Sequence, residues 1–302
     1  VAWARGQTAW IDEHLSRHGA LLFRGGGFDR EETFAEMARV LCGDLFADYG
    51  DLPRTTVGGG VYGSTPYPND RAILFHNESS HLTTWPRRIT FACVEPSSAG
   101  GETPLADGRT VLAALDPAVR QRFAERGLCY VRNFIPGLDV HWQDFFRTDS
   151  PAEVEERCRA AGMELEWTAG DGLRIRQRRP AIVDHPATGA PVWFNQIALH
   201  HVGYLEPAVR DSLVQNFTEE GLPRHVVYGD GSAISTDDLA AVDAAYEQAR
   251  AQFTWQRGDV LLVDNMMAAH GRNPFTGQRR IIVAMGGMQS ATPHNDQPTS
   301  DT

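Results

Sequence analysis

The segment Leu74-Phe75-His76-Asn77-Glu78-Ser79 says most about how this chain folds and what it can bind. It is predicted to be extended, and residues i and i+2 of a strand project from the same face. His76 and Glu78 therefore share a face with Leu74, which should point to the core. Burying a histidine and a carboxylate there is costly unless they are paired or bind a metal. His-x-Glu triplets are common, so a hydrogen-bonded surface pair remains an open alternative.

His270, far downstream, favours a metal site, although a histidine at the end of a strand can also be structural. It follows an apolar strand predicted over 259–264. Two histidines and one carboxylate on one face of an ion leave three coordination positions open, as in non-haem Fe(II) oxygenases. Arg280 opens the next predicted strand and would lie near His270 if the two strands pair as a hairpin. Its planar guanidinium suits the distal carboxylate of a chelating 2-oxoacid, while Arg279 must then point to the other face.

Length and composition are those of a globular protein. The 302 residues could form one large domain or two small ones, and 42% of them are hydrophobic. The net charge of −11 disfavours nucleic-acid binding, and no apolar run reaches the roughly 18 residues of a membrane-spanning helix. The start, Val1-Ala2-Trp3-Ala4-Arg5, lacks the pattern of a secretory signal. Well-separated cysteines without a CxxC pair predict buried free thiols and a cytoplasmic protein, with a disulfide or zinc knuckle as the alternative: Cys42, Cys93, Cys129 and Cys158.

Apolar periodicity predicts strands at both ends of the chain with helices between them. Helices are predicted over 29–42, 117–126, 152–161, 207–217 and 236–252, and strands over 20–23, 89–94, 128–133, 173–177, 181–184, 192–195, 259–264 and 280–285. The glycine-rich stretch 58–68 is expected to be a loop beside the strand of His76. Because no β-α-β alternation appears, the expected fold class is mainly β with helical additions, with a jelly-roll core. We expect one domain over residues 1–289 with a helical insert around 105–170, and a disordered tail over 290–302.

A resemblance to a known family extends over most of the chain. The motifs that carry it are Phe75-His76-Asn77-Glu78, Gly100-Gly101-Glu102-Thr103-Pro104, Asp184-His185-Pro186-Ala187-Thr188-Gly189 running into Trp193-Phe194-Asn195, and Asp264-Asn265 followed by His270-Gly271-Arg272 and Arg279-Arg280. In this order and spacing, from about residue 18 to 286, the chain resembles the taurine dioxygenase family. The resemblance implies a double-stranded β-helix core and an enzyme that uses Fe(II), 2-oxoglutarate and O₂.

Residue by residue, the resemblance implies an iron-binding set and a co-substrate-binding set. The residues that match the iron ligands are His76, Glu78 and His270. Thr103 and Arg280 match the residues that hold the distal carboxylate of 2-oxoglutarate, with Arg279 as the alternative if the register differs by one. The implied reaction is hydroxylation of an unactivated C–H bond, coupled to decarboxylation of 2-oxoglutarate to succinate and CO₂.

Two departures from the family pattern bear on the substrate. Glu78 stands where members that act on sulfonates usually have Asp, and Ala284 stands where they place a further arginine, so taurine is disfavoured. Glu is common in the branch that acts on amino acids in natural-product pathways. We therefore expect an amino acid or an amino-acid-derived metabolite, either free or tethered to a carrier protein. Iron halogenases are disfavoured because they have Gly or Ala in place of Glu78.

Other functions remain open at this point. A desaturase or cyclase of the same family would use the same residues. A zinc hydrolase could use the same three ligands, although it would have no use for Thr103 and Arg280. In a metal-free binding protein, the three ligands would be dispensable.

The sequence indicates few residues that would contact the substrate. Candidates are Tyr62, Tyr67, Asn77, Ser79 and Trp193, each of which is more often a packing residue. Three arginines alternate along one predicted strand, Arg174, Arg176 and Arg178. They indicate a solvated face, or else a docking site for an anionic substrate or a carrier-protein arm.

Overall fold

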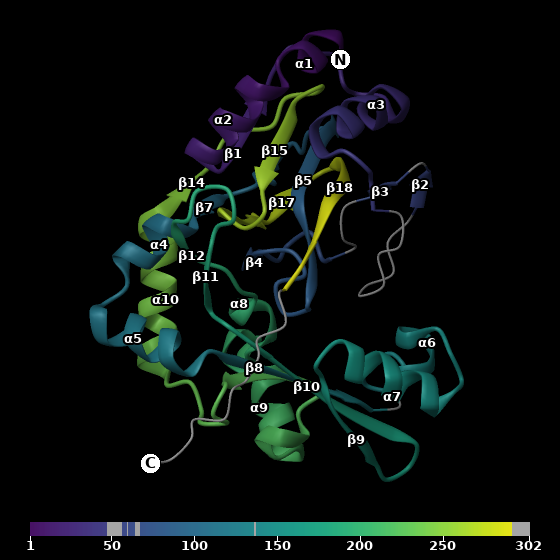
Figure 1. Ribbon diagram of the computed structural model, residues 1–302, viewed down its shortest axis with the longest axis vertical. Coiled ribbons are helices and arrows are strands. Elements are labelled where there is room, and N and C mark those ends of the chain that lie inside the picture. The colour runs from purple at the N-terminus through teal and green to yellow at the C-terminus, as the bar shows by residue number, and fades with distance from the viewer. Residues whose placement is uncertain (47–55, 59, 64–66, 136, 292–302) are drawn as a thin grey trace.

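The computed structural model describes residues 1–46, 56–58, 60–63, 67–135 and 137–291. Helices α1 (Ala2–Gly6), α2 (Thr8–His18) and α3 (Glu31–Cys42) lie at one end of the molecule, and α6 (Trp142–Phe146) and α7 (Pro151–Ala160) lie at the other (Figure 1). The sequence pattern does not predict α1 and α2, because α2 buries only Ile11 and Leu15. Most of the predicted tail, from residue 292 on, lies outside the described residues.

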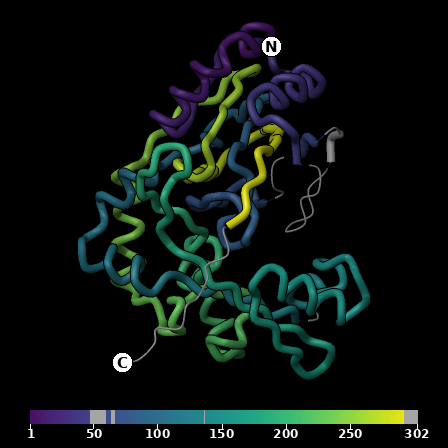
Figure 2. Tube along the Cα trace, viewed as in Figure 1, coloured from purple at the N-terminus to yellow at the C-terminus, as the bar shows by residue number. Residues whose placement is uncertain are grey.

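The largest sheet has six strands, and all neighbours in it are antiparallel. Its order is β1 (Ala20–Phe23), β15 (Val260–Asp264), β5 (Thr84–Glu95), β18 (Arg280–Ser290), β3 (Val61–Gly63) and β2 (Thr56–Gly58). β15 and β18 lie on opposite sides of β5, so the prediction that these two strands pair as a hairpin is wrong (Figure 2). The prediction of a loop throughout 58–68 is also wrong, because β3 forms a strand between β18 and β2.

Helices cover one face of this sheet, which explains the apolar run in β15. Leu262 packs into a cluster with the N-terminal helices, while Leu261 and Val263 pack on the opposite face. Each fully buried leucine or valine contributes about 1.5–3 kcal/mol relative to an exposed one. The predicted helix over 29–42 is confirmed as α3, which buries Phe34, Met37, Ala38 and Leu41. The helix begins after Arg30, two residues later than the predicted range of 29–42.

A second, four-stranded antiparallel sheet faces the first. Its order is β14 (Arg250–Ala251), β7 (Leu105–Asp107), β16 (Ala268–Arg272) and β4 (Ile73–His76). A cavity lies between the two sheets, because its lining includes Phe91 of β5 and Ile281 of β18 together with residues of β4 and β16. The expectation of a mainly β protein with added helices is confirmed, and two facing antiparallel sheets position the cavity.

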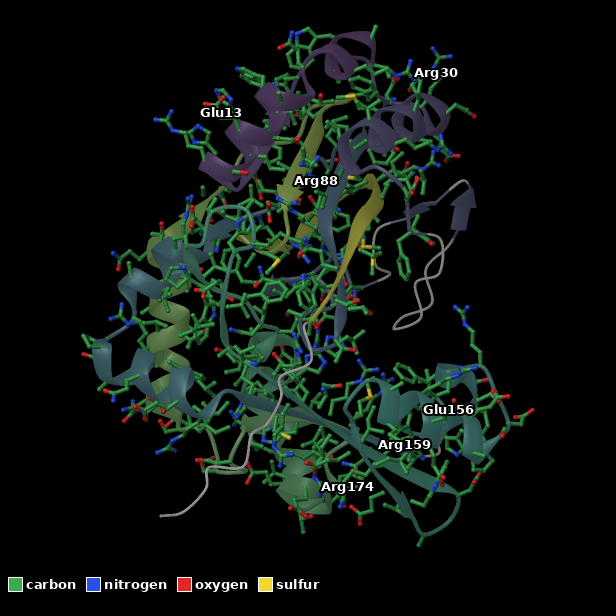
Figure 3. All side chains as sticks on the ribbon, viewed as in Figure 1. Glu13, Arg30, Arg88, Glu156, Arg159 and Arg174 are labelled. Carbon is green, nitrogen blue, oxygen red and sulfur yellow. The ribbon has the colours of Figure 1, made fainter. Side chains whose placement is uncertain are left out.

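A third sheet lies beside α6 and α7, away from the N-terminal helices (Figure 1). Its order is β13 (Arg224–Tyr228), β8 (Leu128–Phe134), β10 (Gly172–Arg179) and β9 (Glu164–Thr168). The three alternating arginines belong to β10, and Figure 3 shows Arg174 at this end of the molecule. Arg174 and Arg176 pair with Glu166, and Arg178 pairs with Glu164. These cross-strand pairs are those of a solvated face.

The remaining elements surround the three sheets. They are α4 (Gly108–Ala114), α5 (Pro117–Arg126), α8 (Ile197–His200), α9 (Pro207–Asn216), α10 (Thr236–Ala249), the hairpin β11 (Ile182–Asp184) with β12 (Pro191–Trp193), and the short pair β6 (Ala99–Gly100) and β17 (Phe275–Thr276). All four cysteines are buried free thiols. Among the described residues, no helix combines the length and apolar character needed to cross a membrane.

Candidate metal centre and co-substrate cavity

Three buried donors meet where the two larger sheets face each other. His76 ends β4 and lies opposite His270 of β16, with the ring centroids 4.3 Å apart. Glu78 follows two residues later, and one ligand atom of each side chain lies within 4.8 Å of the others. All three residues are buried and line the same cavity. The structure therefore brings together the three residues that the sequence suggests as ligands.

Glu78 reaches this position from a turn, not from the strand. β4 ends at His76, and the turn continues through Ser79, whose φ is +57°. Glu78 therefore does not lie on the strand, contrary to the prediction. Asn265 fixes the turn instead: its side-chain oxygen accepts the Glu78 N–H at 2.7 Å, and its side-chain nitrogen donates to the Glu78 carbonyl at 2.9 Å. Sequence reasoning assigned no role to Asn265, although a polar residue directly after an apolar strand was a signal.

A backbone contact determines which nitrogen of His76 can bind a metal. Its Nδ1 lies 2.8 Å from the carbonyl oxygen of Leu74, which can only accept a hydrogen bond. Nδ1 must therefore carry the proton, which leaves the lone pair of neutral His76 on Nε2. A hydrogen bond of this kind orients a ligating imidazole and increases its basicity.

The two adjacent arginines at the start of β18 point in opposite directions. Arg279 lines the cavity, and so do Ile281 and Val283. Arg280 lies on the outside, where its exposed side chain pairs with Glu31 of α3. The prediction that Arg280 lines the co-substrate cavity is therefore wrong by one residue. The reason is side-chain alternation along β18, in which the even-numbered positions face the N-terminal helices.

Arg279 brings a positive charge to the cavity. Its Nε donates to the Gly101 carbonyl at 2.9 Å, and its guanidinium lies 5.5 Å from the centroid of the Phe275 ring. Within the described part of the chain, it has no ion-pair partner. Burial, with the nearby charge of Arg272, lowers the pKa of Arg279 to about 10, so it stays charged at neutral pH.

Gly101 allows Arg279 to lie where it does. A Cβ at Gly101 would lie 3.0 Å from both Cδ and Nε of the arginine and 2.6 Å from the hydroxyl of Ser97. Its φ of +75° is also a conformation that glycine adopts without strain. The second glycine of the Gly-Gly-Glu-Thr motif therefore has a direct role in shaping the cavity wall.

Thr103 lines the same cavity and is buried. Its hydroxyl accepts a hydrogen bond from the indole nitrogen of Trp255 at 3.1 Å. The indole N–H can only donate, so the hydroxyl hydrogen of Thr103 is available for another acceptor. Thr103 and Arg279 thus offer a cavity ligand hydrogen-bond donors.

Arg272 is a second cavity-lining guanidinium to which sequence reasoning gave no role. It is buried, and its terminal nitrogens donate to three backbone carbonyls, those of Tyr67 at 3.2 Å, Pro68 at 2.6 Å and Arg71 at 2.8 Å. The rings of Tyr67 and Phe275 lie 5.7 and 5.1 Å from its guanidinium carbon. Arg272 therefore joins the segment 67–71 to the strand that carries His270. Its position in the His-Gly-Arg motif was the signal in the sequence.

The five candidate substrate contacts do not line this cavity. Trp193 is fully buried and packs on Phe123, and Tyr62 donates to the Phe46 carbonyl. Asn77 has a structural role, because its amide bonds to the backbone of Asn265 and Asn195. Ser79 belongs to the turn of Glu78, and Tyr67 packs beneath Arg272.

The donor set and the charges define what the cavity can hold. Two imidazoles and one carboxylate suit a first-row divalent metal such as Fe(II) and leave coordination positions open. Arg279 and Thr103 suit an anionic group, because a guanidinium presents its donors in a planar fork that matches a carboxylate. A metal with a bound dicarboxylate would satisfy both parts of the cavity.

Comparisons with known proteins agree with this chemistry. Residues 1–285 match the family model described as "Taurine catabolism dioxygenase TauD, TfdA family". The chain is 38% identical over 276 residues to dapdiamide synthesis protein DdaC of Enterobacter agglomerans, covering 91% of this chain and 84% of that protein. It is 30% identical over 291 residues to a clavaminate synthase-like protein of Arabidopsis thaliana, covering 92% and 84%. A taurine dioxygenase structure from Burkholderia xenovorans, 14% identical, shares the fold with a TM-score of 0.54 and coverage of 93% and 80%.

Proposed function

Since this chain belongs to the taurine catabolism dioxygenase TauD, TfdA family, we propose that it hydroxylates an amino acid or an amino-acid-derived metabolite. Its family makes it a non-haem iron dioxygenase that uses Fe(II), 2-oxoglutarate and O₂. We further propose that its two facing sheets are the halves of a double-stranded β-helix. In this proposal, residues 1–289 form one domain.

The proposed ligands of the iron are His76, Glu78 and His270, and the proposed anchors of 2-oxoglutarate are Thr103 and Arg279. One observation carries this assignment: the half-buried guanidinium of Arg279, without an ion-pair partner among the described residues, lines the same cavity as the three donors. A cation partly removed from water and without a counter-ion favours an anionic ligand. Arg279 replaces Arg280 in this role because of the direction in which each side chain points.

The chain's own residues prepare the reaction by holding its components in place. Asn265 positions the Glu78 carboxylate, and the Leu74 carbonyl orients His76. Arg279 and Thr103 would bind the distal carboxylate, which leaves the keto acid end of 2-oxoglutarate directed to the metal. The bound iron supplies the oxidising chemistry that couples decarboxylation of 2-oxoglutarate to succinate and CO₂ with insertion of oxygen into a C–H bond. The apolar walls formed by Phe91, Ile281 and Val283 would keep water out.

Three observations support the proposed substrate class: the identity of Glu78, the residues of β18 that line the cavity, and one related protein. Glu78 is the variant of the triplet expected for enzymes that act on amino acids. After Arg280, which points away from the cavity, β18 has no cation that could bind a sulfonate: Val283 faces the cavity and Ala284 packs on the helix side. The relative named for dapdiamide synthesis supports a role in natural-product biosynthesis. The substrate could be presented free or on a carrier protein.

Turnover with purified protein tests the proposal. Anaerobically loaded enzyme with Fe(II), 2-oxoglutarate and a panel of amino acids is exposed to air, and succinate and products heavier by one oxygen are measured. We expect substrate-stimulated succinate formation and a hydroxylated product. His270→Ala is the control, because removal of one ligand should abolish both. Substrate oxidation that persists in that variant, or turnover without 2-oxoglutarate, contradicts the proposed function.

A further inference from the structure

A second cavity lies between the metal site and the sheet formed by β13, β8, β10 and β9. Its lining comes from the loop after Glu78, from α8, from α6 and from three strands of that sheet: His81, Leu82, Tyr130, Phe145, Gln177, His200 and Arg224 are among the residues involved. None of its lining residues is shared with the cavity of the metal ligands. The proposed function assigns no role to it.

Hydrogen bonds connect this second cavity to the metal ligands. The Tyr130 hydroxyl accepts the backbone N–H of Gln196 at 2.9 Å, and the Gln196 side chain donates to the Asn77 carbonyl at 3.0 Å. Asn77 stands between His76 and Glu78 in the chain. The rings of Tyr130, His81 and His200 also pack against one another, with centroids 4.8 to 5.8 Å apart. The wall of the second cavity is therefore part of the framework that holds the metal ligands.

The polar groups of this cavity include an unsatisfied acceptor. Gln177 is buried, and its Nε2 donates to the Arg178 carbonyl at 3.4 Å. This hydrogen bond determines which end of the side-chain amide is Nε2 and which is Oε1. Oε1 has no hydrogen-bond partner among the described residues. A buried acceptor in this state costs about 1–3 kcal/mol, which a ligand with an N–H or O–H group would recover.

Hydrogen-bond donors are present in this cavity too. Arg224 donates through one terminal nitrogen to Asp139 at 3.1 Å, while its Nε and Nη1 have no acceptor in the described part of the chain.

The charges of the cavity exclude a cationic ligand. Its lining contains no carboxylate, and the nearby carboxylate of Asp139 is already shared by Arg132 and Arg224. Those two arginines lower the pKa of Asp139 against the opposing effect of burial. An ammonium group would therefore find no counter-ion. A neutral group with both an N–H donor and a carbonyl acceptor matches Gln177 and Arg224 together.

From this geometry we propose that the second cavity binds a carboxamide group of the substrate, with its N–H donated to Gln177 Oε1 and its carbonyl accepting from Arg224. The proposal rests on the proposed function, because it takes the cavity beside the metal ligands to be part of the substrate site. The apolar side chains of Leu82 and Phe145 would contact the carbon chain that carries the amide. Gln177 is then a specificity-determining residue.

Binding of propionamide and of its isostere propionate tests this, measured by ligand-observed NMR titration of protein whose first cavity is filled with Zn(II) and N-oxalylglycine, so that Arg279 cannot bind the propionate. The propionamide Kd is compared in the wild type, in Gln177→Met, and in the matched control Gln143→Met. Gln143 is also a glutamine whose Oε1 lacks a partner among the described residues, but it does not line the cavity. We expect propionamide to bind about tenfold more tightly than propionate, and Gln177→Met to remove about that tenfold while Gln143→Met leaves it unchanged.

Propionate binding as tightly as propionamide overturns the proposal, as does propionamide binding that is undetectable or insensitive to Gln177→Met. If Gln177→Met does not fold, the comparison of amide with acid on the wild type decides the matter. The measurement needs neither iron nor turnover. A negative result therefore refutes the amide site while oxidation with Fe(II) and 2-oxoglutarate, the test of the proposed function, can still succeed.

Discussion

Replacing Arg279 should abolish tight binding of 2-oxoglutarate, whereas replacing its neighbour Arg280 should not. The distal carboxylate would lose a charge-assisted hydrogen-bonding partner in a largely buried place. Removing one partner of such a pair costs about 2–5 kcal/mol, and a loss of about 3 kcal/mol weakens binding roughly 150-fold. Arg280→Gln removes only an exposed ion pair with Glu31, which is worth about 0–1 kcal/mol of stability and makes no contact with the cavity. Its effect on the Kd should stay below about twofold.

Calorimetry with Mn(II) and the unreactive analogue N-oxalylglycine measures this without turnover. The thermal stability of the ligand-free variants gives a second, independent result. Arg279→Gln removes a half-buried charge that has no ion-pair partner among the described residues, so the ligand-free protein should melt no lower than the wild type. It should also lose the stabilisation that the analogue gives the wild type. If Arg280→Gln weakens binding more than Arg279→Gln, the side-chain directions in β18 and the reasoning built on them are refuted.

Three further perturbations test other parts of the structure. Asn265→Ala frees the turn of Glu78 and should weaken Mn(II) binding about 10- to 100-fold, as loss of a ligand-orienting partner does, and unchanged affinity in calorimetry would contradict this role. Arg272→Gln leaves carbonyls of the segment 67–71 without donors, so amide exchange measured by mass spectrometry should speed up there, whereas protection equal to the wild type would refute the anchoring role. His201 is buried beside another histidine, and burial, with that neighbour, lowers its pKa from 6.5 to about 4. The unfolded chain thus binds the proton first as pH falls, so folding stability drops between pH 6.5 and 4. The drop from this residue is about 2–3 kcal/mol, and the H201N variant should have a flatter profile of unfolding free energy against pH.

The parts of the fold that could be predicted are those with strong local patterns. The strand 20–23 and the helix 117–126 match the structure at both ends, because an apolar run or an N-terminal proline defines them locally. The pairing of strands could not be predicted in the same way. β15 and β18 lie within 30 residues of each other in the sequence, but β5 separates them in the sheet, and this depends on contacts with residues about 170 positions away.

The part of the candidate site that could be predicted is the part where residue type alone indicates the chemistry, as for the metal ligands. His76, Glu78 and His270 could be named because two imidazoles and a carboxylate have few other uses together. The choice between Arg279 and Arg280 was different. A one-residue change of register reverses every side chain of a strand, and the register of β18 shifts at its first residue. The two side chains are identical, so residue type alone could not show which of them faces the cavity.

The balance of charges in the cavity connects the two halves of the site. Arg279 and Arg272 place two cations on its lining, against the single carboxylate of Glu78. A divalent metal bound alone is therefore repelled by the arginines, while a dianionic co-substrate removes that repulsion. By linkage, each ligand must raise the affinity for the other by the same factor. Arg279→Gln should then bind Mn(II) alone severalfold more tightly than the wild type while losing its affinity for N-oxalylglycine. A variant that loses both affinities together would show that Arg279 supports the shape of the site and does not act through its charge.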